Sequence, residues 1–197
     1  KVPVSQAYGI IEIGLPIINF QKSLEFPNAV GHTLPSYEVA ILDENYNPLP
    51  EGELGHLAIR GKGMFDAYLN PPLTRAQVTK NGYFLTADFA RKHPDGLIVV
   101  EGRQKSVINV SGNKVFPEEV EGILESLPEI ELAKISGVAH PLMGQIIQAE
   151  VVLHAGMSID IETVLTYCRK RLSTYKVPQR LLVVKELEMT KTGKLIR

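Results

Sequence analysis

Two groups of residues in the first half of the chain have types and spacings that suit the binding of a ligand. The first is Tyr8-Gly9-Ile10-Ile11-Glu12, where an aromatic face suits a planar base and a carboxylate oxygen suits Mg²⁺. The second is a strand-like run that ends at Asp88, whose carboxylate suits a ribose diol as a double hydrogen-bond acceptor. Taken singly, a core tyrosine, a surface glutamate and an aspartate capping a turn are the simpler interpretations.

Two further groups follow in the second half of the chain. Gly102-Arg103-Gln104-Lys105 precedes Gly112 and then the acidic run that begins at Pro117, which by itself indicates a strand, a hairpin and a helix. The last group, residues 189–197, places Lys194 directly after a glycine in a threonine-rich loop, so a flexible backbone lets the ammonium approach an anion. By itself this segment is typical of a solvated basic terminus.

The composition excludes several classes of protein. A length of 197 residues with 44% hydrophobic content is typical of one large or two small globular domains, which excludes disordered and collagen-like chains. Basic and acidic residues number 10 and 11 up to Lys105 and 11 of each afterwards, so neither half carries a basic face for nucleic acid. No apolar run approaches the ~20 residues of a transmembrane helix. The single cysteine, Cys168, fits a reducing compartment, so we expect a cytoplasmic protein.

The first hundred residues predict short strands separated by turns. Alternating apolar positions indicate strands over 37–42 and 55–61, and a further strand is expected over 96–100. Asn70 followed by two prolines predicts a helix from residue 70 to about 82. This half is therefore expected to be rich in β-structure.

After Lys105 the pattern changes to that of a small mixed domain. A hairpin is predicted over 107–116, and apolar spacing with a proline start predicts a helix over 117–127. Strands over 133–138 and 145–153, a helix from about 158, and a last strand over 181–184 complete it. The order is a hairpin followed by α-β-β-α-β, which is the pattern of a compact α+β domain in which Cys168 faces the core.

In this order and at these distances, the four groups resemble the adenylate-forming, or AMP-binding, superfamily, to which acyl-CoA synthetases, luciferases and peptide-synthetase adenylation domains belong. The resemblance covers essentially the whole chain. It implies an α+β fold in two parts: the β-rich final portion of a large N-terminal region over 1–104, and a hinge with a small C-terminal domain over 105–197.

The resemblance assigns the nucleotide site to the first part of the chain. It implies that Tyr8 and Gly9 belong to a loop in which the tyrosine stacks on adenine, and that Glu12 is a catalytic residue that holds Mg²⁺. It also implies that Asp88 and Arg103 bind the ribose hydroxyls as acceptor and donor.

Three further roles follow from the same resemblance. Lys105 corresponds to the hinge, and Gly112 to the channel that admits the pantetheine thiol. Lys194 would bridge the substrate carboxylate and the α-phosphate, where a positive charge lowers the cost of bringing two anions together.

Two departures from the family pattern bear on the nucleotide. The family threonine next to Glu12 is Ile11 here, which replaces a hydroxyl by an alkyl group and predicts weaker phosphate binding. A glycine is replaced by Ala87, and lysine stands at 105 where aspartate is commoner.

The implied activity is that of an ATP-dependent acid-thiol ligase. MgATP and a fatty or aryl carboxylic acid would give acyl-AMP and pyrophosphate, and the acyl group would then pass to coenzyme A. The phosphate loop of the family would lie before Lys1, so this stretch alone is expected to be inactive. Two alternatives remain: an adenylation enzyme that loads the phosphopantetheine thiol of a carrier protein, and a noncatalytic relative that senses a ligand or binds a partner.

Overall fold

The computed structural model describes residues 5–20, 28–191 and 195–196. The chain divides into two compact units, Lys1–Gln104 and Lys105–Arg197, and each is described by itself. Strands dominate the first unit, and the second combines strands with helices. The predicted α+β class is confirmed. No helix in the described ranges is long and apolar enough to cross a membrane.

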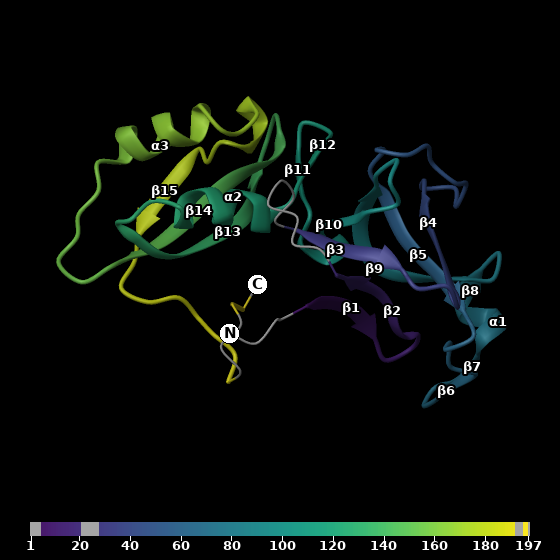
Figure 1. The fold of residues 1–197 in the computed structure, drawn as a ribbon. Coiled ribbons are helices and arrows are strands. Elements are labelled where there is room, and N and C mark those ends of the chain that lie inside the picture. Colours follow the sequence, from purple (N-terminus) through teal and green to yellow (C-terminus); the bar gives the residue numbers. More distant parts are fainter. Residues whose placement is uncertain (1–4, 21–27, 192–194, 197) are drawn as a thin grey trace. The chain divides into compact units, whose positions relative to one another are not determined.

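The first unit is built on an antiparallel sheet, eight-stranded in the residues that the structure describes (Figure 1). The strands run in the spatial order β1 (Gln6–Ile10), β2 (Gly14–Asn19), β3 (Ala29–Thr33), β10 (Ile98–Arg103), β9 (Tyr83–Lys92), β5 (Gly55–Gly61) and β4 (Tyr37–Leu42), and β8 (Thr79–Lys80) pairs with β9. The predicted strands over 37–42 and 55–61 are confirmed at their bounds, and the third, expected over 96–100, begins two residues later and ends three residues later.

The core of this unit comes from alternate positions of its strands, as a two-residue side-chain period requires. Val39 and Ile41 of β4 pair with neighbours on β5 that are equally buried. One cluster gathers the apolar side chains of six strands and two loops: Ile13, Ile17, Val30, Val39, Ile41, Leu57, Ile59, Met64, Ala90 and Ile98.

The helix predicted over 70–82 is wrong except for a single turn. The structure has a small two-stranded sheet, β6 (Ala67–Leu69) with β7 (Pro72–Thr74), and then α1 (Arg75–Val78). Thr74 rather than Asn70 caps this turn through a capping box with Gln77. The chain then enters a hairpin whose turn residues, Asn81 and Gly82, have φ of 50° and 79°. An Asn-Gly pair with positive φ at both residues is the preferred two-residue hairpin turn, and it overrides helix continuation here.

The second unit has its own mixed sheet. Its order is β12 (Asn113–Val115), β11 (Ile108–Val110), β14 (Gly144–Leu153) and β13 (Ile130–His140), with β15 (Arg180–Val183) parallel to β14. The helices α2 (Pro117–Glu125) and α3 (Ile161–Arg169) separate the strands, and short 3₁₀ turns occupy Gln104–Ser106 and Thr174–Lys176. The predicted order of a hairpin followed by α-β-β-α-β is confirmed.

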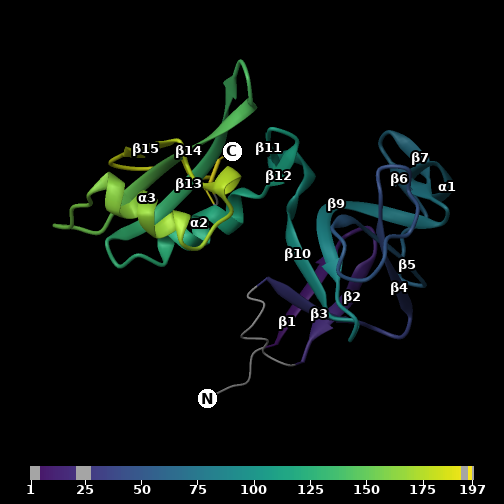
Figure 2. The same ribbon diagram turned by 90° about the horizontal axis from the view of Figure 1, so that it is seen from above.

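Both helices of the second unit cover one face of its sheet (Figures 1 and 2). Ile147, Ala149 and Val151 alternate along β14, so they point to the same face. They share one buried cluster with Val120 of α2 and with Cys168 of α3. The prediction that Cys168 faces the core is confirmed, and burial raises the pKa of its thiol.

Local signals start each of these helices. Pro117 opens α2, and acidic residues in its first turn favour the positive end of the helix dipole. Asp160 caps α3, because its Oδ2 accepts the backbone N–H of Thr163 at 2.9 Å.

Candidate active site

Asp88 lies within strand β9 and does not cap a turn. Its side chain is only 5% exposed. The residue before it, Ala87, has φ of 62°, a left-handed conformation that glycine adopts without the cost that alanine incurs. On the facing strand Glu101 is an extra residue, because the register of β10 shifts between Val100 and Gly102. Such a bulge redirects the neighbouring side chains, and beyond it Asp88 pairs with Arg103.

Three strands bring Tyr8, Asp88 and Arg103 together. The Tyr8 hydroxyl donates a hydrogen bond to Asp88 Oδ2 at 2.5 Å, and Arg103 Nε lies 3.4 Å from Asp88 Oδ1. In the sheet order β2 and β3 separate β1 from β10, so this contact requires the sheet to curl. The fold therefore gathers three residues that stand 80 and 15 positions apart in the sequence.

The charges of this cluster suit a neutral, hydroxyl-rich ligand. Burial, and then the hydrogen bond to Asp88, raise the pKa of Tyr8 far above its ordinary value, so its hydroxyl stays protonated and acts as a donor. Arg103 is 77% exposed and supplies a positive charge at the solvent edge. Each Asp88 oxygen thus faces a donor, and a ribose diol offers donors of the same kind.

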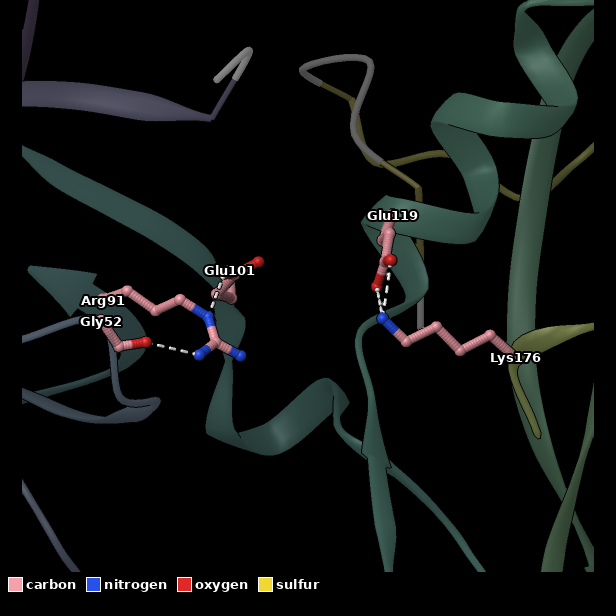
Figure 3. A network of polar contacts seen from close by, with 5 residues as sticks. All are labelled: Gly52, Arg91, Glu101, Glu119 and Lys176. Atoms are coloured by element: carbon pink, nitrogen blue, oxygen red, sulfur yellow. Dashed lines mark hydrogen bonds and ion pairs between the residues drawn. The ribbon is translucent and has the colours of Figure 1, made fainter. Parts of the chain in front are cut away.

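A second polar contact braces the two strands that carry Asp88 and Arg103 (Figure 3). Arg91 of β9 donates through Nε to Glu101 Oε1 at 2.9 Å and through Nη1 to the Gly52 carbonyl at 2.7 Å. Since Glu101 is the extra residue of the bulge, this pair fixes the irregular register beside the site.

Glu12 lies in the tight turn between β1 and β2, where Ile13 N–H donates to the Ile10 carbonyl at 3.1 Å. The Tyr68 hydroxyl donates to Glu12 Oε1 at 2.8 Å. Burial, and then this carboxylate, raise the pKa of Tyr68, which keeps the hydroxyl protonated as a donor. Ile11, the residue that replaces the family threonine, is 99% exposed. The turn therefore presents Ile11 to solvent while Glu12 is held from one side.

Gly9 has a backbone reason to be glycine. A Cβ at this position would lie 2.5 Å from the carbonyl oxygen of Gly14, and the β1–β2 register shifts here. The close approach of the two strands excludes a larger residue. Its part in nucleotide binding stays a prediction.

The two residues implied in domain movement and thiol access lie in the second unit. Lys105 is exposed in the 3₁₀ turn Gln104–Ser106, at the boundary between the two compact units. Gly112 and Ser111 form the turn of the β11–β12 hairpin with φ of 84° and 49°. Their roles as hinge and channel remain predictions.

Lys194 lies outside the described residues. On either side of residues 192–194, Met189 pairs with Leu195, and Ile196 N–H donates to the Glu188 carbonyl at 3.0 Å. The role of Lys194 therefore stays a prediction from the sequence.

Three of the basic residues at the end of α3 or after it have partners in the second unit. Lys176 Nζ donates to both oxygens of Glu119 at 2.6 Å, which ties the Thr174–Lys176 turn to α2 (Figure 3). Arg169 pairs with Glu162 at 2.6 Å, and the Arg171 guanidinium lies 3.6 Å from the centre of the Tyr167 ring. These contacts stabilise the helix ends, which is sufficient to explain much of the positive charge in this region.

The sequence interpretation missed Tyr68, which contacts Glu12, and Arg75, which donates to the carbonyls of Met64 and Phe65 close to Tyr68. Tyr68 is 56 residues from Glu12, and Arg75 lies within the segment predicted as a helix over 70–82, of which only Arg75–Val78 is helical. No spacing rule links such distant positions, so only the folded chain reveals them.

Family models cover most of the chain. Residues 1–69 match the AMP-binding enzyme model, and residues 119–194 match the model of the AMP-binding enzyme C-terminal domain. The first match contains Tyr8 and Glu12, and the second ends at Lys194.

Curated relatives and solved structures agree with these matches. The chain is 34% identical over its full length to oxalate–CoA ligase of Saccharomyces cerevisiae, covering 37% of that protein, and 34% identical to 2-succinylbenzoate–CoA ligase of Geobacillus kaustophilus, covering 40%. The structure of ATP-bound MatB from Rhodopseudomonas palustris superimposes with a TM-score of 0.85 at 28% identity, over 98% of this chain and 39% of that one. The chain thus spans about two fifths of the length of the proteins it matches. It belongs to the adenylate-forming superfamily.

Proposed function

We propose that the whole protein is an ATP-dependent acid–CoA ligase of the cytoplasm. It converts a carboxylic acid and MgATP into acyl-AMP and pyrophosphate, and then coenzyme A and acyl-AMP into acyl-CoA and AMP. The observation that carries this proposal is the Tyr8–Asp88–Arg103 cluster, in which a buried carboxylate is surrounded by donors. It occurs in a chain that CoA ligases match from end to end.

In this proposal the cluster binds the adenosine. Asp88 accepts hydrogen bonds from the ribose hydroxyls, which replace the donors that face it in the free protein. Arg103 donates from the solvent side, where its long side chain has room to move. The half-buried ring of Tyr8 supplies an apolar surface on which adenine stacks.

Glu12 fits the role of an Mg²⁺ ligand. No cluster of three or more metal-ligating side chains occurs among the described residues, so the protein does not offer a complete cage there. Mg²⁺ requires none, because it is commonly held by one or two carboxylates together with water and substrate phosphates. A single half-buried glutamate, four residues after Tyr8 in the chain, suffices. When bound, Mg²⁺ neutralises phosphate charge.

The first reaction joins two anions. A carboxylate oxygen forms a bond to the α-phosphorus, the bond from that phosphorus to the bridging oxygen breaks, and pyrophosphate leaves with the electron pair. Lys194 donates to both the carboxylate and the α-phosphate, so its charge offsets their repulsion.

The second reaction transfers the acyl group to sulfur. The thiolate attacks the acyl carbon and AMP leaves. We assign Lys105 to the hinge that exchanges the two states, and the Gly112 turn to the path of the pantetheine arm, since this turn has open space around it. A carrier protein bearing phosphopantetheine would present the same thiol. The acceptor is therefore decided by comparing transfer to coenzyme A with transfer to a carrier protein.

The test is ATP–pyrophosphate exchange by the whole protein against fatty, aryl and dicarboxylic acids, followed by transfer to coenzyme A or to a purified phosphopantetheinyl carrier. We expect acid-dependent exchange, and transfer to coenzyme A. Absence of exchange with every acid, with no heat of MgATP binding in calorimetry, would identify a noncatalytic relative.

Replacing Ile11 by threonine is expected to strengthen ATP binding. The Ile11 side chain is 99% exposed, so the change removes no packing. At so exposed a position an added hydrogen bond contributes about 0.5–1.5 kcal/mol, so the KM for ATP falls roughly twofold to tenfold. Ile11→Val is the matched control, because it keeps the branched shape without the hydroxyl. Equal KM values for the threonine and valine variants would contradict the prediction.

A further inference from the structure

The 64–68 loop, whose last two residues begin strand β6, holds Glu12 at two points. Tyr68 Oη donates to Glu12 Oε1 at 2.8 Å, and Phe65 N–H donates to the Glu12 carbonyl at 2.8 Å. One contact fixes the carboxylate and the other fixes the backbone of the same residue. Glu12 Oε2 makes no hydrogen bond to any residue within the described ranges, so one oxygen is oriented while the other stays available.

Aromatic packing keeps the loop in place. The Phe65 and Tyr68 rings meet edge to face with centroids 4.6 Å apart, and Phe65 meets Phe84 of β9 in the same way at 5.9 Å. Met64 is 7% exposed and belongs to the core of the first unit. The Tyr68 hydroxyl is thus carried by a ring that is anchored to the sheet.

Arg75 fixes the backbone of the same loop. Its Nε donates to the Phe65 carbonyl and its Nη2 to the Met64 carbonyl, both at 2.7 Å. A third contact, from Nη2 to Asp66 Oδ1 at 2.7 Å, involves a carboxylate that is 99% exposed. A planar guanidinium holds two adjacent carbonyls at once, which a lysine ammonium does not reproduce with the same geometry.

We propose that Tyr68 and Arg75 are positioning residues that orient the Glu12 carboxylate for the divalent cation of the nucleotide complex. This inference rests on the proposed function. Tyr68 acts directly on the carboxylate, and Arg75 acts through the loop that carries Tyr68. Partners that orient a metal ligand typically account for 10- to 100-fold in metal affinity, so a substantial effect is expected from residues that touch neither metal nor nucleotide.

The first test removes one hydroxyl. In the whole protein, Tyr68→Phe is expected to raise the dissociation constant of the Mn²⁺–ATP complex, followed by electron paramagnetic resonance of Mn²⁺, by about tenfold. The thermal midpoint is expected to remain close to that of the original protein, because the ring and its packing are retained.

Tyr83→Phe is the matched control. Tyr83 also donates its hydroxyl to a glutamate, Glu38, within the first unit. This control is expected to bind Mn²⁺–ATP like the original protein. Unchanged Mn²⁺–ATP binding in a folded Tyr68→Phe variant would overturn the role of Tyr68. An original protein without Mn²⁺–ATP binding or pyrophosphate exchange would instead refute the proposed function.

The second test addresses the loop and decides the matter if Tyr68→Phe does not fold. Arg75→Lys is expected to speed hydrogen exchange at the backbone of residues 64–68 and to weaken Mn²⁺–ATP binding about threefold to tenfold. Asp66→Ala removes only the exposed carboxylate partner, and exposed ion pairs contribute little, so it is expected to change neither quantity. Faster exchange in Arg75→Lys with unaltered Mn²⁺–ATP binding would show that the loop is only structural.

Discussion

Replacing Asp88 by asparagine is expected to lower kcat/KM for ATP by about 10²-fold or more in the whole protein. A hydrogen bond to a charged group contributes about 1.5–3 kcal/mol, and the carboxylate is proposed to accept two from the ribose. Asparagine keeps the shape but has one acceptor, and its amide donors would face Tyr8 or Arg103, which are donors themselves. Steady-state kinetics with varied ATP measures the loss.

Deoxynucleotides separate ribose recognition from a general disturbance of the sheet. The original protein should prefer ATP over 2′-deoxyATP and 3′-deoxyATP, and Asp88→Asn should lose most of that preference. Asp95→Asn is the matched control, because Asp95 is an exposed aspartate in the β9–β10 connection that accepts the Leu97 N–H at 3.0 Å. If Asp88→Asn keeps the full preference for the ribose hydroxyls, the assignment of Asp88 is wrong.

The sequence predicted well those elements in which apolar side chains recur with the period of a strand or of a helix. Large apolar residues recur at every second position in β4 and β5, as at Val39 and Ile41, and α2 combines a proline start with Val120 and Leu124 one turn apart. The segment after Asn70 failed because its prolines and polar residues suit either a helix start or a turn. In the structure this segment pairs as strands on both sides, in β6–β7 and in the β8–β9 hairpin, which leaves only Arg75–Val78 helical.

For the candidate site, the sequence identified residues but not their contacts. Tyr8, Asp88 and Arg103 were recognised by order and spacing, yet the hydrogen bond from Tyr8 to Asp88 depends on a curled sheet that no local pattern encodes. The bulge at Glu101 was equally hidden, since only two residues of β10 follow it, too few to show the change of phase that an extra residue causes. Tyr68 was missed because a lone tyrosine in a three-residue strand carries no motif.

Replacing Lys194 by alanine is expected to slow adenylation by about 10²- to 10³-fold. Removing a donor that stabilises charge in the transition state costs about 3–4 kcal/mol, and the proposed role of Lys194 is to bring such a charge to two anions. The binding of ATP should change much less, because the adenosine contacts are assigned to Tyr8, Asp88 and Arg103. Acid-dependent pyrophosphate exchange and calorimetric titration with MgATP measure the two effects.

The second half-reaction makes this prediction specific. When chemically prepared acyl-AMP and coenzyme A are supplied, Lys194→Ala should form acyl-CoA at nearly the original rate, because the charge on phosphate is needed only while the acyl–phosphate bond forms. Lys191→Ala removes an exposed lysine three residues earlier and should leave both half-reactions intact. Equal losses in the two half-reactions of Lys194→Ala would mean that the lysine supports the fold or binds both substrates, and that the two steps do not use different arrangements of the protein.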